Sequence, residues 1–376
     1  MKILFVAGGT GGHINPAIAV ATEIKRLYPT TEILFVGTKN RMETKIVPAA
    51  GFPIKTVEMN GFSRKISIKG IKNNVKTAHL TIRASAEAKK IIKEFSPDVV
   101  VGFGGYVTGP VLRAAARMNI PTCIHEQNAF PGVANKTLAK MVDRVMLTSP
   151  EAEKYMKCKN PPVCTGLPVR RQILQADRDF ARASLNVKPN EMLVLSMGGS
   201  LGAREINNAV IGMLSELYNE KNIKFIHATG QYGGYVWDEL KKLNIPYGKN
   251  TNIDLREYIN DMDICLPACD LVISRAGASS ISEISALAKP SILIPSPNVA
   301  ENHQFHNANT LASNGGAILI EEKDLTSELL AQTVKELKNN RNKLAEISVR
   351  ASEKAKTNAL SEICKIVVSL AENKNI

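Results

Sequence analysis

The fold is decided near the N-terminus by residues 2–13, Lys-Ile-Leu-Phe-Val-Ala-Gly-Gly-Thr-Gly-Gly-His. Residues 2–7 are an apolar run with the length of a buried β-strand, and a helical pattern over residues 14–27 follows the glycines. A strand that ends in such a turn directs several backbone N–H groups and the positive end of a helix at one place. This arrangement predicts an anion site, most often for phosphate.

The same alternation of short apolar runs and helix-period segments continues along the chain. We predict further strands at residues 32–37, 98–103, 122–125, 192–196, 224–228, 271–274 and 291–294. Apolar runs of this kind, separated by helices, are typical of a doubly wound parallel sheet. The second half opens as the first does, with a strand, the glycine-rich residues 198–202 and a helix.

We therefore predict an α/β protein with two Rossmann-like domains that face a cleft. The N-terminal domain is expected over residues 1–165 and the C-terminal domain over residues 166–349, joined by the proline-rich segment 161–171. A C-terminal helix, at about residues 350–376, is expected to pack back on the first domain. The length of 376 residues and the 44% hydrophobic content suit two packed cores and exclude a disordered chain.

The net charge of +13 lies entirely in the first half. Residues 1–165 hold 24 Lys and Arg against 11 Asp and Glu, whereas residues 166–376 hold 24 of each. Such asymmetry indicates a surface that meets something anionic: nucleic acid, a membrane surface or a phosphorylated substrate. The excess is densest in residues 64–93, where only Glu87 opposes nine basic residues: Arg64, Lys65, Lys69, Lys72, Lys76, Arg83, Lys89, Lys90 and Lys93. A solvated helix face is the alternative interpretation.

The same segment carries apolar residues at helical spacing. They are Ile68, Ile71, Val75, Ala78, Ile82 and Ala86. We expect this stripe to face the core, which leaves the flanking lysines as the better candidates for contact with a membrane.

No metal-binding pattern is convincing. The six cysteines show neither CxxC pairs nor zinc spacing, and His303 and His306 lack the Glu of an HExxH motif. Asp261 and Asp263 form a DxD, but helix capping explains them better than metal chelation. We therefore expect no metal and no other cofactor. We expect a cytosolic protein that can still lie on a membrane. The thiols are scattered, no secretory signal is visible, and no apolar run approaches the ~18 residues of a spanning helix.

Four glycine-rich or small-residue turns follow strands, two in each half, at residues 8–12, 104–106, 198–202 and 275–279. The first lacks the Lys-Ser/Thr of a P-loop, and the strand after it ends without the acidic residue of a dinucleotide site. Together the four turns predict phosphate or sugar chemistry in a cleft between the domains. Tight turns without a ligand are the alternative.

Several polar residues stand beside these turns. His13 follows the first turn and is a candidate general base, because imidazole titrates near neutrality. The polar run 125–128 follows a predicted strand, where such folds bind ligands. Arg170 stands at the joint between the domains, suited to a diphosphate. Glu283 could accept both hydroxyls of a ribose, or could be an ordinary residue on a helix face.

These motifs resemble those of the MurG family of glycosyltransferases over essentially the whole chain. The resemblance rests on Gly-Gly-Thr-Gly-Gly-His at residues 8–13, Gly-Gly-Tyr-Val-Thr-Gly-Pro at 104–110, His-Glu-Gln-Asn at 125–128, Gly-Gly-Ser-Leu-Gly-Ala-Arg at 198–204, residues 275–283 and His-Gln at 303–304. It implies a GT-B fold and transfer of N-acetylglucosamine from UDP-GlcNAc, with inversion, to the muramyl 4-hydroxyl of lipid I, which yields lipid II. It also implies a peripheral enzyme on the cytoplasmic side of the cell membrane, and partners in an anionic membrane surface and the cell-wall or division machinery.

The resemblance assigns roles to individual residues. Donor binding is implied for Asn128, Arg170, Ser200, Ile259, Ala278, Ser279, Ser280, Ile281, Ser282, Glu283 and Gln304. Among these, Ser200 and Arg170 would contact the diphosphate, Ile259 would offer its backbone to uracil, Glu283 would bind the ribose, and Asn128 and Gln304 would bind the sugar. The acceptor would be held by Thr10, Gly11, Gly12, Gly104, Gly105 and Tyr106, with His13 as the base. Where family patterns often have two glutamines, this chain has His303-Gln304.

Three other functions are compatible with part of the pattern. A UDP-GlcNAc 2-epimerase would share the fold and the donor, but would not need a basic first domain. A related GT-B glycolipid synthase would differ only in the acceptor. A nucleic-acid-binding protein would explain the charge but not the glycine turns, and with 5% aromatic residues the chain shows no interleaving of aromatic and basic side chains.

Overall fold

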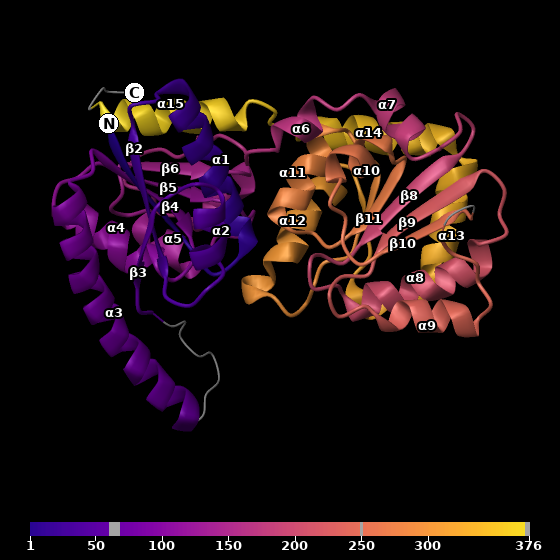
Figure 1. Ribbon diagram of the computed structural model, residues 1–376, viewed down its shortest axis with the longest axis horizontal. Coiled ribbons are helices and arrows are strands. Elements are labelled where there is room, and N and C mark those ends of the chain that lie inside the picture. Colours follow the sequence, from indigo (N-terminus) through magenta and orange to yellow (C-terminus); the bar gives the residue numbers. More distant parts are fainter. Residues whose placement is uncertain (60–67, 249–250, 373–376) are drawn as a thin grey trace. The chain divides into compact units, whose positions relative to one another are not determined.

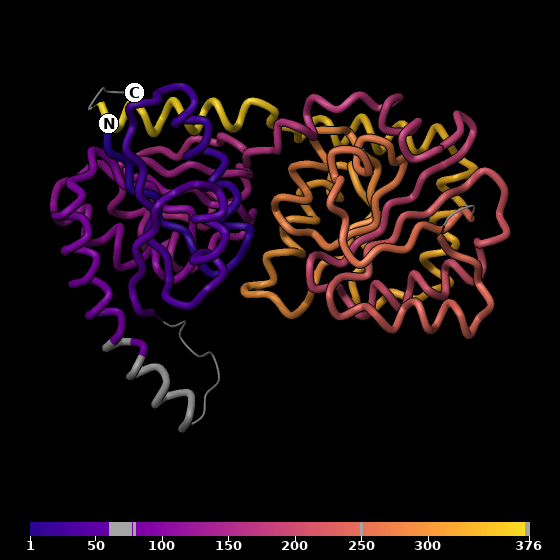
Figure 2. Tube along the Cα trace, in the orientation of Figure 1, coloured from indigo at the N-terminus to yellow at the C-terminus, as the bar shows by residue number. Residues whose placement is uncertain are grey.

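The chain folds into two compact units (Figure 1). The computed structural model describes residues 1–59, 68–248 and 251–372, and within residues 68–79 it describes the side chain of Thr77 only. The first unit comprises Met1–Pro168 and Asn358–Ile376, and the second comprises Val169–Thr357. The trace in Figure 2 therefore leaves the first unit after Pro168 and returns to it at Asn358.

The first unit is a parallel sheet with helices on both faces. Its elements are β1 (Lys2–Ala7), α1 (Gly11–Leu27), β2 (Glu32–Thr38), α2 (Glu43–Ala49), β3 (Ile54–Val57), α3 (Ile68–Phe95), β4 (Val99–Gly104), α4 (Thr108–Arg117), β5 (Thr122–Glu126), α5 (Val133–Leu138), β6 (Arg144–Leu147), a 3-10 helix (Pro150–Tyr155), β7 (Val163–Cys164) and α15 (Ala359–Ala371). The strand order is β3-β2-β1-β4-β5-β6-β7, and every pairing is parallel.

Alternating side chains of β1 enter two different cores. Leu4 and Val6 pack with residues of α3, α4 and α5 on one face of the sheet. Ile3 and Phe5 pack on the other face with α1 and α15, where Phe5 stacks on Phe35 at 5.2 Å between ring centroids. Because both faces of the strand are buried, its sequence is a continuous apolar run rather than an alternating one.

The second unit repeats this plan. Its elements are α6 (Arg171–Leu174), α7 (Arg178–Ser184), β8 (Met192–Met197), α8 (Arg204–Leu217), β9 (Ile223–Ala228), α9 (Tyr235–Lys242), β10 (Ile253–Arg256), α10 (Met262–Ala268), β11 (Leu271–Ser274), α11 (Ala278–Ala286), β12 (Ser291–Leu293), a 3-10 helix (Ala300–Asn302), α12 (His303–Ala312), β13 (Ile318–Leu319), a 3-10 helix (Glu322–Asp324), α13 (Ser327–Asn339) and α14 (Arg341–Ser352). The strand order is β10-β9-β8-β11-β12-β13, again all parallel. The predicted doubly wound fold is thereby confirmed in both halves.

Strand order reverses direction once in each sheet. The reversal lies between β1 and β4 in the first unit and between β8 and β11 in the second. In open α/β sheets, ligands bind beyond the carboxyl ends of the strands at this topological switch point. The four turns singled out in the sequence follow β1, β4, β8 and β11, so all four lie at switch points.

Helix α3 corrects one prediction. The residues that it buries include Thr77, Leu80, Ala84 and Ala88, whereas Ile82 is 73% exposed and Ala86 is also exposed. The expectation of a core-facing stripe is therefore wrong for Ile82 and Ala86, because the helix turns its Thr77–Leu80–Ala84 side to the sheet. The other members, Ile68, Ile71, Val75 and Ala78, lie outside the described side chains, as do the basic residues Arg64, Lys65, Lys69, Lys72 and Lys76. Among the described residues, no helix combines the length and the apolar character needed to cross a bilayer.

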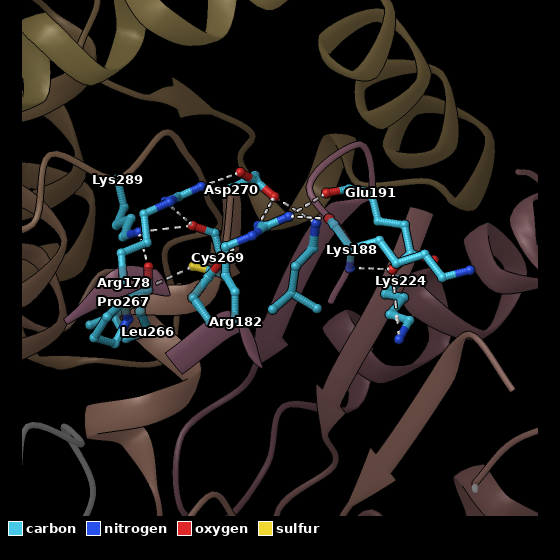
Figure 3. Close-up of polar contacts among 12 residues, drawn as sticks. Arg178, Arg182, Lys188, Glu191, Lys224, Leu266, Pro267, Cys269, Asp270 and Lys289 are labelled. Carbon is cyan, nitrogen blue, oxygen red and sulfur yellow. Dashed lines mark hydrogen bonds and ion pairs between the residues drawn. The ribbon is translucent and has the colours of Figure 1, made fainter. Parts of the chain in front are cut away.

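A network of ion pairs stabilises the second unit at the amino ends of its strands (Figure 3). Asp270, which precedes β11, accepts hydrogen bonds from Arg178, from Arg182 at 2.9 Å and from the backbone N–H of Leu193 at 2.8 Å. The buried Lys289 donates to the carbonyl oxygens of Pro267 and Cys269. These bonds tie α7, α10 and β11 together.

Beside this network lies a cavity of about 740 Å³. Its lining includes Met192, which begins β8, and Asn222 and Asp270, which immediately precede β9 and β11. The cavity thus opens at the edge of the sheet opposite to the switch point, and it includes none of the predicted donor residues.

Candidate functional site

Two glycine turns contact each other at the switch point of the first unit. The backbone N–H of Gly8 donates to the carbonyl oxygen of Gly104 at 3.3 Å. A Cβ on Gly105 would lie 2.3 Å from the Gly8 carbonyl oxygen, and Gly105 has φ +89°. Only glycine allows this approach without strain. The structure therefore brings together the two turns that the sequence analysis assigned to the acceptor.

His13 lies against this pair of turns. Its Nδ1 is 3.0 Å from the carbonyl oxygen of Gly8 and 3.3 Å from the Thr10 hydroxyl. A carbonyl oxygen only accepts hydrogen bonds, so the proton of the neutral ring belongs on Nδ1 and the lone pair on Nε2. The ring edge carrying Nε2 packs on Gly104, where a Cβ would lie 3.0 Å from Nε2. The lone pair suited to a general base is thus beside the second turn.

Helix α1 adds backbone donors at the same place. It begins at Gly11 with Thr10 as an extended N-cap, and its first turn holds no acidic residue. The N–H groups of Gly11 and Gly12 have no partner within the helix, as in every helix N-terminus, so they are suited to an anion. Tyr106, in the second turn, is exposed.

Asn128 is held by a buried carboxylate that the sequence analysis left without a role. Glu126 accepts from the backbone N–H of Asn128 at 2.9 Å and from its side-chain amide at 3.2 Å. The same carboxylate accepts from Gly132 N at 3.1 Å and Asn135 Nδ2 at 2.9 Å. Glu126 thereby fixes the loop that carries Asn128. In the sequence, the only sign of this role of Glu126 is its place in the polar His-Glu-Gln-Asn run at residues 125–128.

His125, in the same run, is not available to a ligand. The buried ring contacts the carbonyl oxygen of Gly166 through Nε2 at 2.8 Å and Gln127 Nε2 through Nδ1 at 3.2 Å. It also stacks on Phe103 at 5.5 Å. Burial lowers the pKa of His125 to about 4, so the ring is neutral in the folded protein at neutral pH. Its role is to join β5 to the segment around Gly166.

His227, in the second unit, is a second buried histidine. It is buried at the end of β9, where Nδ1 lies 2.8 Å from the Ser196 hydroxyl, and burial lowers its pKa to about 4. An unfolded histidine titrates near pH 6.5. Between pH 6.5 and 4 the unfolded chain therefore binds more protons than the folded one, and stability falls as the pH falls.

We expect each of these histidines to lower the free energy of unfolding by about 2 kcal/mol between pH 7 and pH 5. The measurement is urea unfolding at the two pH values. In a His125→Gln variant, which keeps a donor for Gly166 but does not titrate, the pH-dependent loss should shrink by about that amount. Equal stability of the unmodified chain at both pH values would contradict the prediction.

On the second unit, the turn after β8 packs on a neighbouring turn. A Cβ on Gly202 would lie 2.2 Å from the Thr229 carbonyl oxygen, and Gly202 has φ +85°. Ser200 projects from this turn and is exposed, while its carbonyl oxygen accepts the N–H of Gln231 at 3.1 Å. These contacts fix the backbone of Ser200 at the switch point, and its side chain projects from there.

Across the switch point, α11 presents its N-terminus. Its N-cap is Gly277, no side chain caps it, and its first turn holds no acidic residue. All six predicted donor residues of this helix are partly exposed: Ala278, Ser279, Ser280, Ile281, Ser282 and Glu283. The free N–H groups of the first turn and the helix dipole favour a phosphate here.

Arg170 and Glu283 form a bidentate ion pair. Nε and Nη2 of Arg170 donate to the two carboxylate oxygens of Glu283 at 2.8 and 3.1 Å. The Arg170 side chain is 54% exposed, so this pair is oriented at the surface of the unit rather than buried in it. Two predicted donor residues that lie 113 positions apart are thus brought together. The guanidinium keeps further N–H groups, and the carboxylate further lone pairs, for a ligand.

Two further predicted donor residues, Ile259 and Gln304, lie after strands of this sheet. The side chain of Ile259 is buried in the core, so only the backbone of this residue could contact a ligand. Gln304, at the start of α12, accepts the N–H of Ser296 at 2.9 Å through Oε1. This bond leaves Nε2 as the end that would donate to a sugar hydroxyl. Asn128 belongs to the first unit and the others to the second.

The DxD carboxylate Asp261 is engaged by an arginine. It accepts from Arg256 Nη1 at 2.7 Å, and the same guanidinium also bonds Asp254. Among the side chains that the structure describes, no three of His, Cys, Asp or Glu gather as a metal site would require.

Comparison with known proteins identifies both domains. Residues 3–147 match the glycosyltransferase family 28 N-terminal domain, and residues 193–363 match the glycosyltransferase family 28 C-terminal domain. A UDP-N-acetylglucosamine–N-acetylmuramyl-(pentapeptide) pyrophosphoryl-undecaprenol N-acetylglucosamine transferase of Acetivibrio thermocellus is 44% identical over 376 residues, covering 100% of this chain and 99% of the relative. The enzyme of the same name from Desulforamulus reducens is 43% identical and covers 98% of each chain.

Solved structures agree with these sequence comparisons. The crystal structure of Acinetobacter baumannii MurG superposes with a TM-score of 0.79 at 28% identity, covering 98% of this chain and 99% of that one. A putative UDP-N-acetylglucosamine 2-epimerase of Listeria monocytogenes reaches a TM-score of 0.69, but at 14% identity it shares the fold alone. The fold is GT-B, and the chain belongs to the MurG family of UDP-N-acetylglucosamine–N-acetylmuramyl-(pentapeptide) pyrophosphoryl-undecaprenol N-acetylglucosamine transferases.

Proposed function

We propose that this chain transfers N-acetylglucosamine from UDP-GlcNAc to the muramyl 4-hydroxyl of lipid I, giving lipid II and UDP for peptidoglycan synthesis. Identity of 44% along the whole chain supports the substrates, because it extends over both domains and not only over a nucleotide-binding half. In the geometry, the observation that carries the proposal is the placement of His13. Its Nδ1 is tied to Gly8 and its Nε2 edge lies on Gly104, at a switch point where backbone N–H groups suit an acceptor diphosphate.

The reaction that we propose is a single inverting displacement. The lone pair of His13 Nε2 accepts the proton of the acceptor hydroxyl, and that oxygen attacks the anomeric carbon of the sugar. The bond from this carbon to the diphosphate oxygen breaks, and UDP leaves with the electron pair. In this scheme Thr10, Gly11, Gly12, Gly104, Gly105 and Tyr106 hold the acceptor.

The leaving diphosphate acquires negative charge that must be stabilised. Preorganised N–H groups and cations are the usual means, and the N-terminus of α11 with Arg170 provides both. Ser200 would bind the diphosphate beside them, Glu283 the ribose, Ile259 the uracil, and Gln304 and Asn128 the sugar. This set requires no metal ion, so we propose metal-independent chemistry.

The proposal is tested by incubating the protein with UDP-GlcNAc and a lipid I analogue and measuring UDP release. We expect release that depends on the acceptor, a disaccharide product with the inverted anomeric configuration, and the same rate in excess chelator. Formation of the 2-epimer without acceptor would select the epimerase instead. Turnover with a different glycolipid acceptor, but not with the lipid I analogue, would select a glycolipid synthase.

We further propose that the first domain binds the anionic surface of the cell membrane from the cytoplasmic side. The described part of α3 exposes Ile82 together with Lys89, Lys90 and Lys93. An apolar side chain among lysines on one helix is suited to the interface of an anionic bilayer. These three lysines at ~1 kcal/mol each would give ~3 kcal/mol, more than about a hundredfold in affinity.

The corresponding prediction is that binding to vesicles with anionic lipid is largely lost at high salt, because salt screens these interactions. Sedimentation with vesicles at low and at high ionic strength measures it. Replacing Lys89 and Lys93 by glutamate should weaken binding about 30-fold or more, from the loss of two such contacts. The matched control replaces Lys221 and Lys241, both exposed on the second unit. Binding that ignores salt, or equal effects of the two double variants, would contradict the prediction.

A further inference from the structure

Glu43, at the start of α2, is a fully buried carboxylate beneath the first glycine turn. Its exposure is 0%. Oε2 accepts the backbone N–H of Gly9 at 3.2 Å, and Oε1 accepts the backbone N–H of Thr38 at 2.8 Å. The carboxylate thus joins the ends of β1 and β2.

Two glycines make room for this side chain. A Cβ on Gly8 would lie 2.6 Å from Glu43 Oε1, and a Cβ on Gly37 would lie 2.6 Å from Glu43 Cγ. Both are distances that real Cβ atoms do not reach. The backbone at the ends of β1 and β2 is therefore shaped around Glu43, which is the sign of a specific position rather than of a side chain that fills space.

A single peptide group connects Glu43 to His13. The N–H of the peptide between Gly8 and Gly9 donates to Glu43, and the C=O of the same peptide accepts from His13 Nδ1 at 3.0 Å. Hydrogen bonds in a chain polarise one another, so an amide that donates to a carboxylate is a stronger acceptor at its oxygen. The Thr10 hydroxyl also lies near Nδ1, but a hydroxyl can donate or accept and does not select a tautomer.

We propose that Glu43 is a positioning residue for His13. Through the Gly8–Gly9 peptide it holds the proton on Nδ1 and keeps the lone pair on Nε2, facing Gly104. The arrangement does the work of a carboxylate bonded directly to a catalytic histidine, with a peptide group inserted between the two. The inference rests on the proposed function in one respect only, which is the role of His13 as the base.

The first test is kinetic and uses Glu43→Gln. The amide has one oxygen for two N–H donors and carries no charge, so in either orientation the Gly8–Gly9 peptide no longer donates to a carboxylate. We expect kcat to fall about 10- to 100-fold, the range seen for outer partners of metal-bound histidines, with the KM for UDP-GlcNAc unchanged. Asp143→Asn is the control: it removes another carboxylate of the same unit that accepts a backbone N–H, from Thr122 at 2.9 Å. An equal loss in both variants would overturn the proposal.

The second test does not depend on activity. With ¹⁵N-labelled histidine, the signals of His13 are identified by their absence in His13→Gln. We expect the unmodified protein above neutral pH to show Nδ1 protonated and Nε2 unprotonated, and Glu43→Gln to shift the population toward the Nε2-protonated form. A dominant Nε2-protonated form in the unmodified protein would overturn the proposal even if Glu43→Gln did not fold. If His13→Gln stayed active while the expected tautomers were seen, the base assignment would fall and the positioning by Glu43 would stand.

Discussion

Replacement of His13 by alanine is expected to reduce turnover about 100-fold or more, while UDP-GlcNAc still binds. In the proposed mechanism the imidazole offers an unprotonated Nε2 beside Gly104, and no other described histidine in the first unit is suited to replace it. His125 is buried with both nitrogens engaged. The measurement is kcat with a lipid I analogue, alongside calorimetric binding of UDP-GlcNAc.

A second substitution separates proton transfer from packing. In His13→Gln the amide can still donate to the Gly8 carbonyl and fill most of the space, but it does not accept a proton. We expect turnover as low as that of the alanine variant. Near-normal turnover in either variant, with binding of UDP-GlcNAc intact, would remove His13 from the role of base.

The second large effect is expected at Arg170. Changing it to glutamine removes the cation that would face the leaving diphosphate, and it leaves the Glu283 carboxylate without its bidentate partner. We expect kcat to fall about 100-fold, as when one stabilising donor is removed from an oxyanion site, and the KM for UDP-GlcNAc to rise.

The matched control for Arg170 is its neighbour. Arg171 is exposed at the start of α6, and Arg171→Gln removes the same charge one residue away. Activity within twofold of the unmodified enzyme is expected for this variant. If both variants lost the same activity, general electrostatic attraction of UDP-GlcNAc would explain the result, and the specific role of Arg170 would be lost.

The sheets could be predicted from sequence because they depend on local patterns. Continuous apolar runs such as residues 2–7 and 271–274 coincide with β1 and β11, since strands buried on both faces need no partner to be recognised. The sequence did not predict five short strands: β3, β6, β7, β10 and β13. They have two to four residues and depend on the neighbour to which they bond.

Some features of the candidate site could also be predicted from sequence, and others could not. The glycine turns are visible because positive φ and close backbone approach demand glycine, as at Gly105. Partners that meet only in the folded chain were not visible: the Glu43 carboxylate under Gly9, and the ion pair between Arg170 and Glu283. His125 appeared in sequence as part of a ligand-binding cluster, because sequence does not reveal that Gly166 returns to bond it.

Helix α15 has a consequence for the order in which the chain folds. It completes the core of the first unit, where Ile363 and Val367 pack with Val20 and Ile24 of α1. Translation at roughly 5–20 residues per second needs about 10 to 40 s to pass from Val169 to Thr357, and α15 leaves the ribosome only afterwards. During this interval the sheet already covers part of the apolar surface of α1, but the part that packs on α15 is still exposed. We therefore expect a first domain expressed without residues 358–372 to aggregate, whereas the second unit, Val169–Thr357, closes its core with one continuous segment of the chain.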